Sequence, residues 1–141
     1  MEAPKLLKGQ KALVTGAHSG IGRAVAVSRG KAGADVAVNY VAGEDSAKET
    51  CDEIKAFGGD AIPIHGDVSN EERVRAMFQT MFDRFETIEI LVNNAGLQRA
   101  TAIEHMTLAQ WNTVMSVNLA GQFLCSREVI REFGRRGVAG T

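Results

Sequence analysis

Cysteine, proline and aromatic residues are scarce in this sequence, and neither sign of charge predominates. The chain of 141 residues contains 2 cysteines, 2 prolines, 1 tyrosine and 1 tryptophan. Cys51 and Cys125 lie far apart within helical patterns, and the three histidines show no metal-ligand spacing with them. We therefore expect two reduced, packed cysteines, no disulfide framework and no structural metal.

The charge and hydropathy patterns exclude further classes of protein. Sixteen basic and seventeen acidic residues give a formal net charge of −1, so no overall field favours nucleic acid or an anionic membrane. No apolar run approaches the ~20 residues of a membrane span, and the N-terminal segment carries charges where a signal peptide would have an apolar core. We expect a cytoplasmic protein without nucleic-acid or membrane partners.

What the sequence does contain is fifteen glycines and a regular alternation of short apolar segments with longer amphipathic ones. The apolar segments predict strands, and the amphipathic segments predict helices. Strands are expected at 11–15, 34–39, 61–65 and 88–92, and helices at 21–31, at 45–57, after 69 and at 107–133. Capping boxes are expected at Ser46/Glu49, Ser69/Glu72 and Thr107/Gln110.

This order of elements predicts a single α/β domain over residues 1–141. Strands joined by helical crossovers pair in parallel, and the right-handed crossover rule leaves few arrangements. We expect a doubly wound parallel sheet in strand order 3-2-1-4, with the third strand, which contains Pro63, at an edge. Such sheets bind ligands beyond the carboxyl ends of their strands where the winding reverses, here between the first and fourth strands.

A glycine-rich turn follows the first strand. Gly16, Gly20 and Gly22 lie between that strand and the next helix. Glycine permits positive φ and a close approach of the backbone to a phosphate, while free N–H groups at the helix start face the anion. The turn therefore predicts a Rossmann-like dinucleotide site. A plain strand-to-helix turn is the alternative.

Four motifs in chain order resemble those of the short-chain dehydrogenase/reductase family. They are Thr-Gly-x-x-x-Gly-x-Gly at 15–22, Asp67-Val68 after the third strand, Asn-Asn-Ala-Gly at 93–96 after the fourth, and Asn118 in the last helix. Within the family, the segments at 38–40, 58–61 and 94–97 look most like those of glucose 1-dehydrogenases. The resemblance implies an oxidoreductase that uses NAD or NADP and transfers hydride between nicotinamide and a secondary alcohol or a sugar such as glucose.

The resemblance also implies roles for individual residues. Asp67 would accept a hydrogen bond from the adenine amino group and Val68 would lie against the ring; alternatively, Asp67 only shapes the turn before Ser69. Asn93 would tie strands together, and the alternative for Asn93 and Asn94 is that they are ordinary turn formers. The other implied cofactor-binding residues are Gly16, His18, Ser19, Gly20, Ile21 and Gly22 around the pyrophosphate and its ribose, and Asn94, Ala95 and Gly96 on the adenosine and nicotinamide side.

The choice between NAD and NADP depends on the end of the second strand, where an acidic residue that binds the ribose hydroxyls selects NAD. Asn39 is expected to occupy that place. It would not repel a 2′-phosphate as an aspartate would, and Tyr40 and Val41 offer no positive charge to attract one. We therefore expect a site that is open to both cofactors.

The catalytic Tyr-x-x-x-Lys pair of the family is absent, because the one tyrosine, Tyr40, is followed four residues later by Glu44. Asn118, which kinks the last helix in the family, is the one residue of the implied catalytic set that is present; its alternative is a packed polar helix residue. We expect a truncated chain that carries the cofactor-binding half and binds cofactor without turnover. The alternatives are a non-catalytic nucleotide-binding module and an interaction partner of a full-length homologue. The open edge of the fourth strand favours a homo-oligomer.

Overall fold

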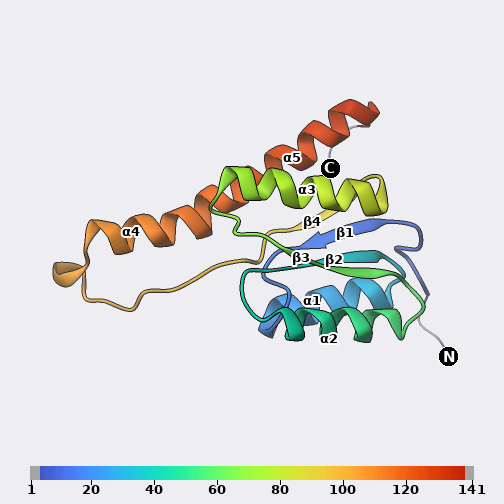
Figure 1. Cartoon of the computed structure of the whole chain (residues 1–141), viewed down its shortest axis with the longest axis horizontal. Helices are drawn as coiled ribbons and strands as arrows, with labels where there is room; N and C mark the ends of the chain where they lie inside the picture. The colour runs from blue at the N-terminus through green and yellow to red at the C-terminus, as the bar shows by residue number, and fades with distance from the viewer. Residues whose placement is uncertain (1–3, 139–141) are drawn as a thin grey trace.

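The computed structural model describes residues 4–138 and places four parallel strands in one sheet, in the order β3-β2-β1-β4 (Figure 1). This order confirms the predicted doubly wound sheet. Pro63 lies on the edge strand β3, opposite Val38, at a position that tolerates its missing N–H. The strands are β1 (Lys11–Val14), β2 (Asp35–Tyr40), β3 (Ala61–His65) and β4 (Ile90–Val92).

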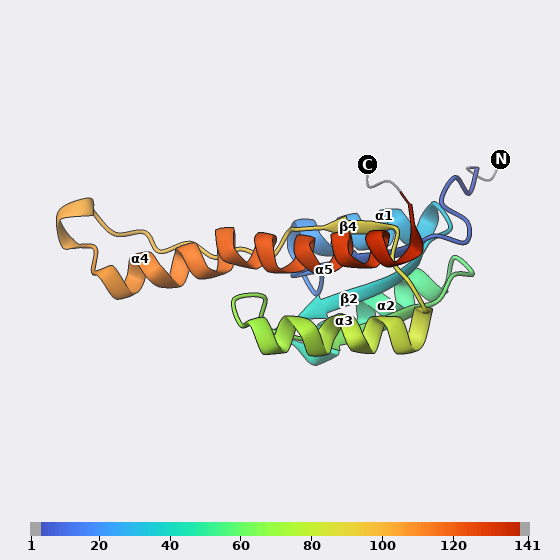
Figure 2. The same ribbon diagram turned by 90° about the horizontal axis from the view of Figure 1, so that it is seen from above.

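Helices cover both faces of the sheet. They include α1 (Gly20–Lys31), α2 (Glu44–Lys55), α3 (Glu71–Phe85) and α5 (Gly121–Arg136). α1 and α2 lie on one face, and α3 and α5 lie on the other (Figures 1 and 2). Because successive strand residues point to opposite faces, β1 contributes Ala12 and Val14 to the core under α1 and α2, and Leu13 to the core under α3 and α5. The two faces of β1 are thus both buried, which explains its continuous apolar sequence.

α2 begins earlier than the predicted capping box at Ser46/Glu49. Gly43 adopts a left-handed conformation (φ 82°), and its carbonyl accepts a hydrogen bond from the N–H of Ala47 (3.0 Å), so the helix starts at Glu44. Glycine is favoured at such a position, and a carboxylate in the first turn stabilises the helix dipole. Ser46 therefore lies inside the helix, and the box predicted there is wrong.

α3 is capped one residue later than predicted. The side chain of Asn70 accepts a hydrogen bond from the backbone N–H of Arg73 (3.0 Å). Ser69, the expected cap, is engaged elsewhere, because its N–H and its hydroxyl both donate to Asp67 (2.9 and 2.7 Å). The capping box predicted at Ser69/Glu72 is therefore wrong, because Asp67 binds both donors of Ser69.

The last predicted helix is present but contains an irregular turn. Its capping box at Thr107/Gln110 is confirmed. From there α4 (Leu108–Met115) continues through a π-helical turn, η2 (Ser116–Ala120), into α5, and a short 3-10 helix, η1 (Ile103–His105), precedes it. In Figure 1 α4 extends well beyond the sheet, and no strand of residues 4–138 lies beneath it.

The two cysteines are buried on opposite sides of the sheet, Cys51 on α2 and Cys125 on α5, and neither forms a disulfide. Burial raises the pKa of the Cys51 thiol to about 11 and that of Cys125 to about 12. Both thiols therefore remain protonated at neutral pH and act as small packing residues. Within residues 4–138 no helix is long and apolar enough to cross a membrane.

Candidate functional site

A cavity of about 520 Å³ opens at the carboxyl ends of the strands, and segments that follow all four strands line it. The volume lies in the range of small-molecule sites. Four lining residues are not predicted by sequence analysis: Val41, Ala42, Leu97 and Val117. Gly20, although predicted, borders a separate pocket between α1 and α2. The predicted residues that the structure brings together here are Gly16, His18, Ser19, Ile21, Gly22, Asn39, Asp67, Val68, Asn94, Ala95 and Gly96.

The start of α1 presents an uncompensated positive end to this cavity. Its N-cap residue, Ser19, makes no side-chain capping hydrogen bond, and the first turn contains no acidic residue. By contrast, α2 and α3 each carry two acidic residues in their first turns. Unpaired N–H groups and the helix dipole together attract an anion. The start of α1 thus has the electrostatic character of a phosphate-binding site.

The glycine turn has no room for side chains at its narrowest point. Gly16 (φ 60°) and Gly20 (φ 56°) both have left-handed backbone conformations that favour glycine. A Cβ atom added to Gly22 would lie 2.3 Å from the carbonyl oxygen of Gly16 and 2.4 Å from Nδ2 of Asn94. The third glycine is therefore required by the turn's own packing and not only by a ligand.

Thr15 and Asn94 join the glycine turn to the end of β4. The Asn94 side chain donates from Nδ2 to the carbonyl oxygens of Thr15 and Gly16 (both 3.1 Å). The hydroxyl of Thr15 accepts hydrogen bonds from the backbone N–H groups of Asn94 (3.0 Å) and Ala95 (2.9 Å). The amide hydrogens of the Asn94 side chain are thus committed to the turn, so a cofactor role of Asn94 would involve its other atoms. The sequence places Thr15 at the start of the glycine motif, but it did not predict the hydrogen bonds of the Thr15 hydroxyl.

Asn39 does not present its side chain as expected. It is 1% exposed; Oδ1 accepts from the N–H of Gly16 (3.0 Å), and Nδ2 donates to the carbonyl of Gly66 (2.9 Å). β2 continues to Tyr40, so Asn39 is not the last residue of the strand. Asn39 still lines the cavity, and its contact with a ribose stays a prediction. The residue beyond the strand that lines the cavity is Val41.

Asp67 and Val68 border the cavity and also have structural roles. Oδ1 of Asp67 accepts both hydrogen bonds from Ser69, so the residue shapes this turn, and its contact with adenine stays a prediction. Oδ2 has no hydrogen-bond partner among the described residues. Val68 is buried, and it lies so close to α5 that a Cβ on Gly121 would be 2.7 Å from its Cγ2. Asp67 therefore keeps one carboxylate oxygen for a ligand.

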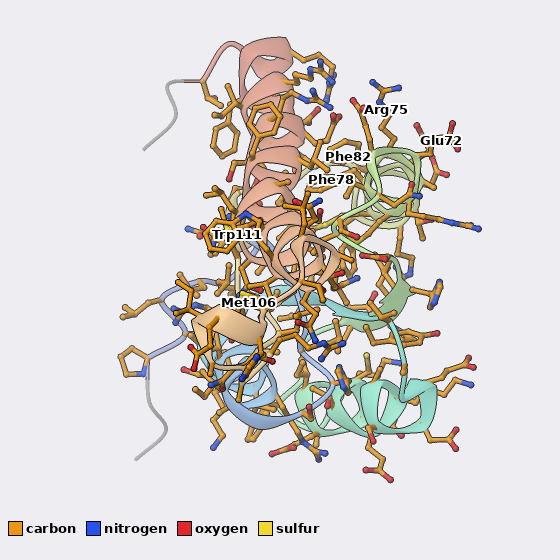
Figure 3. The ribbon with its side chains drawn as sticks, turned by 90° about the vertical axis from the view of Figure 1, so that its left-hand side faces the viewer. Glu72, Arg75, Phe78, Phe82, Met106 and Trp111 are labelled. Carbon is orange, nitrogen blue, oxygen red and sulfur yellow. The ribbon has the colours of Figure 1, made fainter. Side chains whose placement is uncertain are left out.

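Asn118 lies in the π-helical turn and binds the segment that follows β4. Its Oδ1 accepts from the N–H of Leu97 (2.8 Å), and its Nδ2 donates to the carbonyl of the same residue (2.9 Å). Asn118 lines a second pocket next to the main cavity, and Leu97 lines both. Met106 and Trp111, labelled in Figure 3, border this second pocket. The carboxamide of Asn118 thus holds a piece of the cavity wall in place.

β4 is bound to one strand and one helix. In the described part of the chain it pairs only with β1, through Ala12 opposite Ile90 and Val14 opposite Val92. Beyond the strand, Nδ2 of Asn93 donates to the hydroxyl of Ser126 on α5 (3.1 Å). Asn93 therefore ties the end of β4 to α5, and within residues 4–138 its side chain makes no hydrogen bond to another strand, so the expected tie between strands is not found there.

Comparison with known families agrees with these features of the site. They are the cavity at the winding reversal, the glycine turn and the start of α1 without a side-chain cap. The sequence profile of the family described as short chain dehydrogenase matches residues 10–140. The chain belongs to the short-chain dehydrogenase family. The Asn94 and Asn118 contacts described above therefore belong to a short-chain dehydrogenase chain.

Solved structures of other family members are similar to this chain. A short-chain type dehydrogenase/reductase from Mycobacterium marinum is 36% identical with a TM-score of 0.91, over 96% of this chain and 55% of that one. A short chain dehydrogenase from Burkholderia cenocepacia in complex with NADP is 35% identical with a TM-score of 0.87, over 90% of this chain and 52% of that one. A mutant short-chain dehydrogenase/reductase from Serratia marcescens is 29% identical with a TM-score of 0.87, over 90% of this chain and 52% of that one. This short-chain dehydrogenase sequence thus spans about half the length of the solved chains it matches.

Proposed function

We propose that this chain holds NAD or NADP in the cavity at the carboxyl ends of its strands, as the cofactor-binding part of a short-chain dehydrogenase. The observation that carries the proposal is the start of α1, whose first turn has neither an acid nor a side-chain cap and follows a glycine turn at the winding reversal. The NADP complex of the family member from Burkholderia cenocepacia supports the choice of ligand.

Each part of the cavity suits a different part of a dinucleotide. The N–H groups at the start of α1 would bind the pyrophosphate, and the free Oδ2 of Asp67 would accept from the adenine amino group, beside Val68. Leu97 and Val117 supply apolar surface to the same cavity. When bound, the cofactor would supply the hydride acceptor or donor for an alcohol or carbonyl substrate.

Ile21 offers a direct test of nucleotide binding. Its side chain is 78% exposed and lines the cavity beside the start of α1, so a substitution there leaves the core intact. In Ile21→Asp the carboxylate competes with the pyrophosphate, and we expect at least about tenfold weaker binding of NAD and NADP by calorimetry. The same carboxylate stabilises the first turn, so the melting temperature is expected to stay level or rise. Ile21→Asn is the uncharged control; equal affinities of the two variants would contradict the proposal.

For the whole protein we propose hydride transfer with a secondary alcohol or a sugar such as glucose. The 141 residues contain a single tyrosine, Tyr40, followed four residues on by Glu44, so they lack a Tyr-x-x-x-Lys pair to take the alcohol proton. We expect the purified chain to bind cofactor and to reduce neither NAD nor NADP when glucose is added. Glucose-dependent cofactor reduction above the rate without protein would contradict this expectation. Binding without turnover also fits a non-catalytic nucleotide-binding module, the second candidate function.

We further propose that the chain self-associates through an apolar stripe on α4, η2 and α5. The stripe consists of Leu108, Trp111, Leu119, Phe123 and Ile130, all more than half exposed. Exposed apolar side chains gathered along one helix mark interaction surfaces. Ile130→Glu is expected to shift the protein towards monomer in analytical ultracentrifugation, with at least about tenfold weaker association. Thr113→Glu, an exposed α4 position outside the stripe, is the matched control, and an equal shift in both variants would argue against this surface.

A further inference from the structure

The second pocket lies between α4 and the segment that follows β4. This segment runs out alongside α4 to η1, where the chain turns back, so both sides of the pocket come from one long excursion of the chain (Figures 1 and 2). The pocket has a volume of about 340 Å³, within the range of small-molecule sites. It is therefore large enough to hold a ligand of its own beside the main cavity.

The lining of the second pocket combines apolar walls with one cation. Arg99 is the one charged residue among the described residues that line it, and the uncharged polar ones are Gln98 and Asn118. The carboxamide of Asn118 is committed to the backbone of Leu97 (2.8 and 2.9 Å), which leaves Arg99 and Gln98 to bind a polar group. The apolar walls are supplied by Leu97, Met106, Trp111, Val114 and Met115.

Arg99 is exposed and forms no ion pair within residues 4–138. Its side-chain hydrogen bond there is a long one, from an Nη atom to the carbonyl of Gln98 (3.4 Å). Glu104, the acid nearest to it along the chain, lies on η1 and does not line the pocket. By contrast, the exposed guanidinium of Arg84 pairs with Asp60. The Arg99 guanidinium is thus available to an anion at the edge of an apolar pocket.

The pocket suits a carboxylate better than a phosphate group. A guanidinium binds a carboxylate through two parallel hydrogen bonds, and one arginine balances its single charge. A phosphate group carries nearly two charges, and helix starts with free N–H groups are its usual sites. The start of α4 beside this pocket is closed by its own capping box, in which Thr107 and Gln110 bind each other's backbone N–H groups (3.1 and 2.9 Å).

We propose that the second pocket binds a monocarboxylate with an apolar body, whose charged end pairs with Arg99. The apolar body lies against Met106 and Trp111. Because Leu97 lines both cavities, this ligand lies next to the nucleotide-binding cavity. One further step rests on the proposed function: the ligand is the substrate, so the alcohol or carbonyl compound is a hydroxy or oxo acid and not a neutral sugar.

Trp111 is the one tryptophan of the chain, so its fluorescence reports on this pocket. The test titrates the full chain with octanoate and with octanamide, its uncharged analogue. We expect a saturable change in emission, with octanoate bound at least about fivefold more tightly than octanamide. In Arg99→Gln, octanoate should bind about fivefold more weakly than in the parent, and the two probes should bind about equally.

Arg73→Gln is the matched control for the loss of charge. Arg73 is exposed on α3 and does not line the pocket, so this variant should bind octanoate as the parent does. Equal affinities of the parent for octanoate and octanamide would overturn the inference. So would equal losses of octanoate affinity in Arg99→Gln and Arg73→Gln, or the absence of any saturable signal in the parent.

Trp111 also belongs to the apolar stripe proposed for self-association, so the titration is repeated in Ile130→Glu. Ile130 lies on α5 and does not line the pocket. Octanoate should therefore bind to this variant as it binds to the parent. An octanoate signal that disappears in Ile130→Glu would assign the effect to contact with a second copy of the chain and would overturn the inference.

A titration with NADP present separates this inference from the proposed function. NADP in the main cavity would order the Leu97 segment that both cavities share, so octanoate is expected to bind at least about twofold more tightly at saturating NADP. If NADP binds and leaves octanoate affinity unchanged, the assignment of the ligand as substrate is overturned. If NADP does not bind at all, the proposed function fails, and the carboxylate site is still decided by Arg99→Gln.

Discussion

Gly22→Ala is expected to abolish nucleotide binding and to lower the free energy of unfolding by about 3 kcal/mol. The added Cβ would lie 2.3 Å from the carbonyl oxygen of Gly16, a backbone atom that cannot move aside without distorting the turn. The same atom accepts a hydrogen bond from Asn94 (3.1 Å), so the distortion would spread to the end of β4. Urea denaturation and calorimetry with NADP measure the two effects.

Gly134→Ala is the matched control for this substitution. Gly134 lies within α5, and a Cβ there would have no heavy atom within 4 Å. Alanine is the better helix former, so the free energy of unfolding is expected to rise by up to about 1 kcal/mol, with nucleotide affinity unchanged. If Gly22→Ala unfolds at the same urea concentration as Gly134→Ala, the close packing of the turn is not what requires glycine.

Thr15→Val is expected to lower the free energy of unfolding by about 3 kcal/mol, although valine and threonine have nearly the same shape. Thr15 is 2% exposed, and its hydroxyl is the acceptor for the backbone N–H groups of Asn94 and Ala95. Valine leaves both part-buried N–H groups without this partner, and an unpaired donor away from water costs about 1–3 kcal/mol. Denaturant unfolding measures the loss, and hydrogen exchange of the Asn94 and Ala95 amides locates it.

Thr15→Ser separates the contribution of the hydroxyl group to stability from that of the methyl group. Serine keeps the acceptor for Asn94 and Ala95 and loses one buried methyl group, so the expected loss is about 1 kcal/mol. The amides of Asn94 and Ala95 should then remain protected from exchange. Equal losses of stability in Thr15→Ser and Thr15→Val would assign the effect to packing and not to the two hydrogen bonds.

The sheet was predictable because its order follows from general rules applied to the alternation of strands and helices. The residues at which the helices start were harder to predict from the sequence. Ser69 and Asn70 are adjacent, and both are good capping residues. The choice between them depends on Asp67, which takes both hydrogen-bond donors of Ser69. No pattern in the helix itself contains that information.

Much of the cavity lining was also predictable, because the glycine turn and the residues after each strand must meet at one edge of the sheet. The side-chain contacts of Asn39 could not be predicted, because the groups that it binds, the N–H of Gly16 and the carbonyl of Gly66, lie in other segments of the sequence. The role of the Thr15 hydroxyl was not predicted, because the groups that bind it, on Asn94 and Ala95, come from a distant part of the sequence. Such a contact leaves no local signal.

The bonds between Thr15 and Asn94 also bear on the order of folding. β1 pairs with β2 across a short crossover, Ala12 opposite Val36, whereas its pairing with β4, Ala12 opposite Ile90, closes a much longer loop. Long-range pairings are slow because the entropy of loop closure is lost before any contact forms. We therefore expect the cavity to be completed late in folding, when Asn94 reaches the glycine turn. A nucleotide bound there is expected to slow unfolding and to leave the folding rate nearly unchanged.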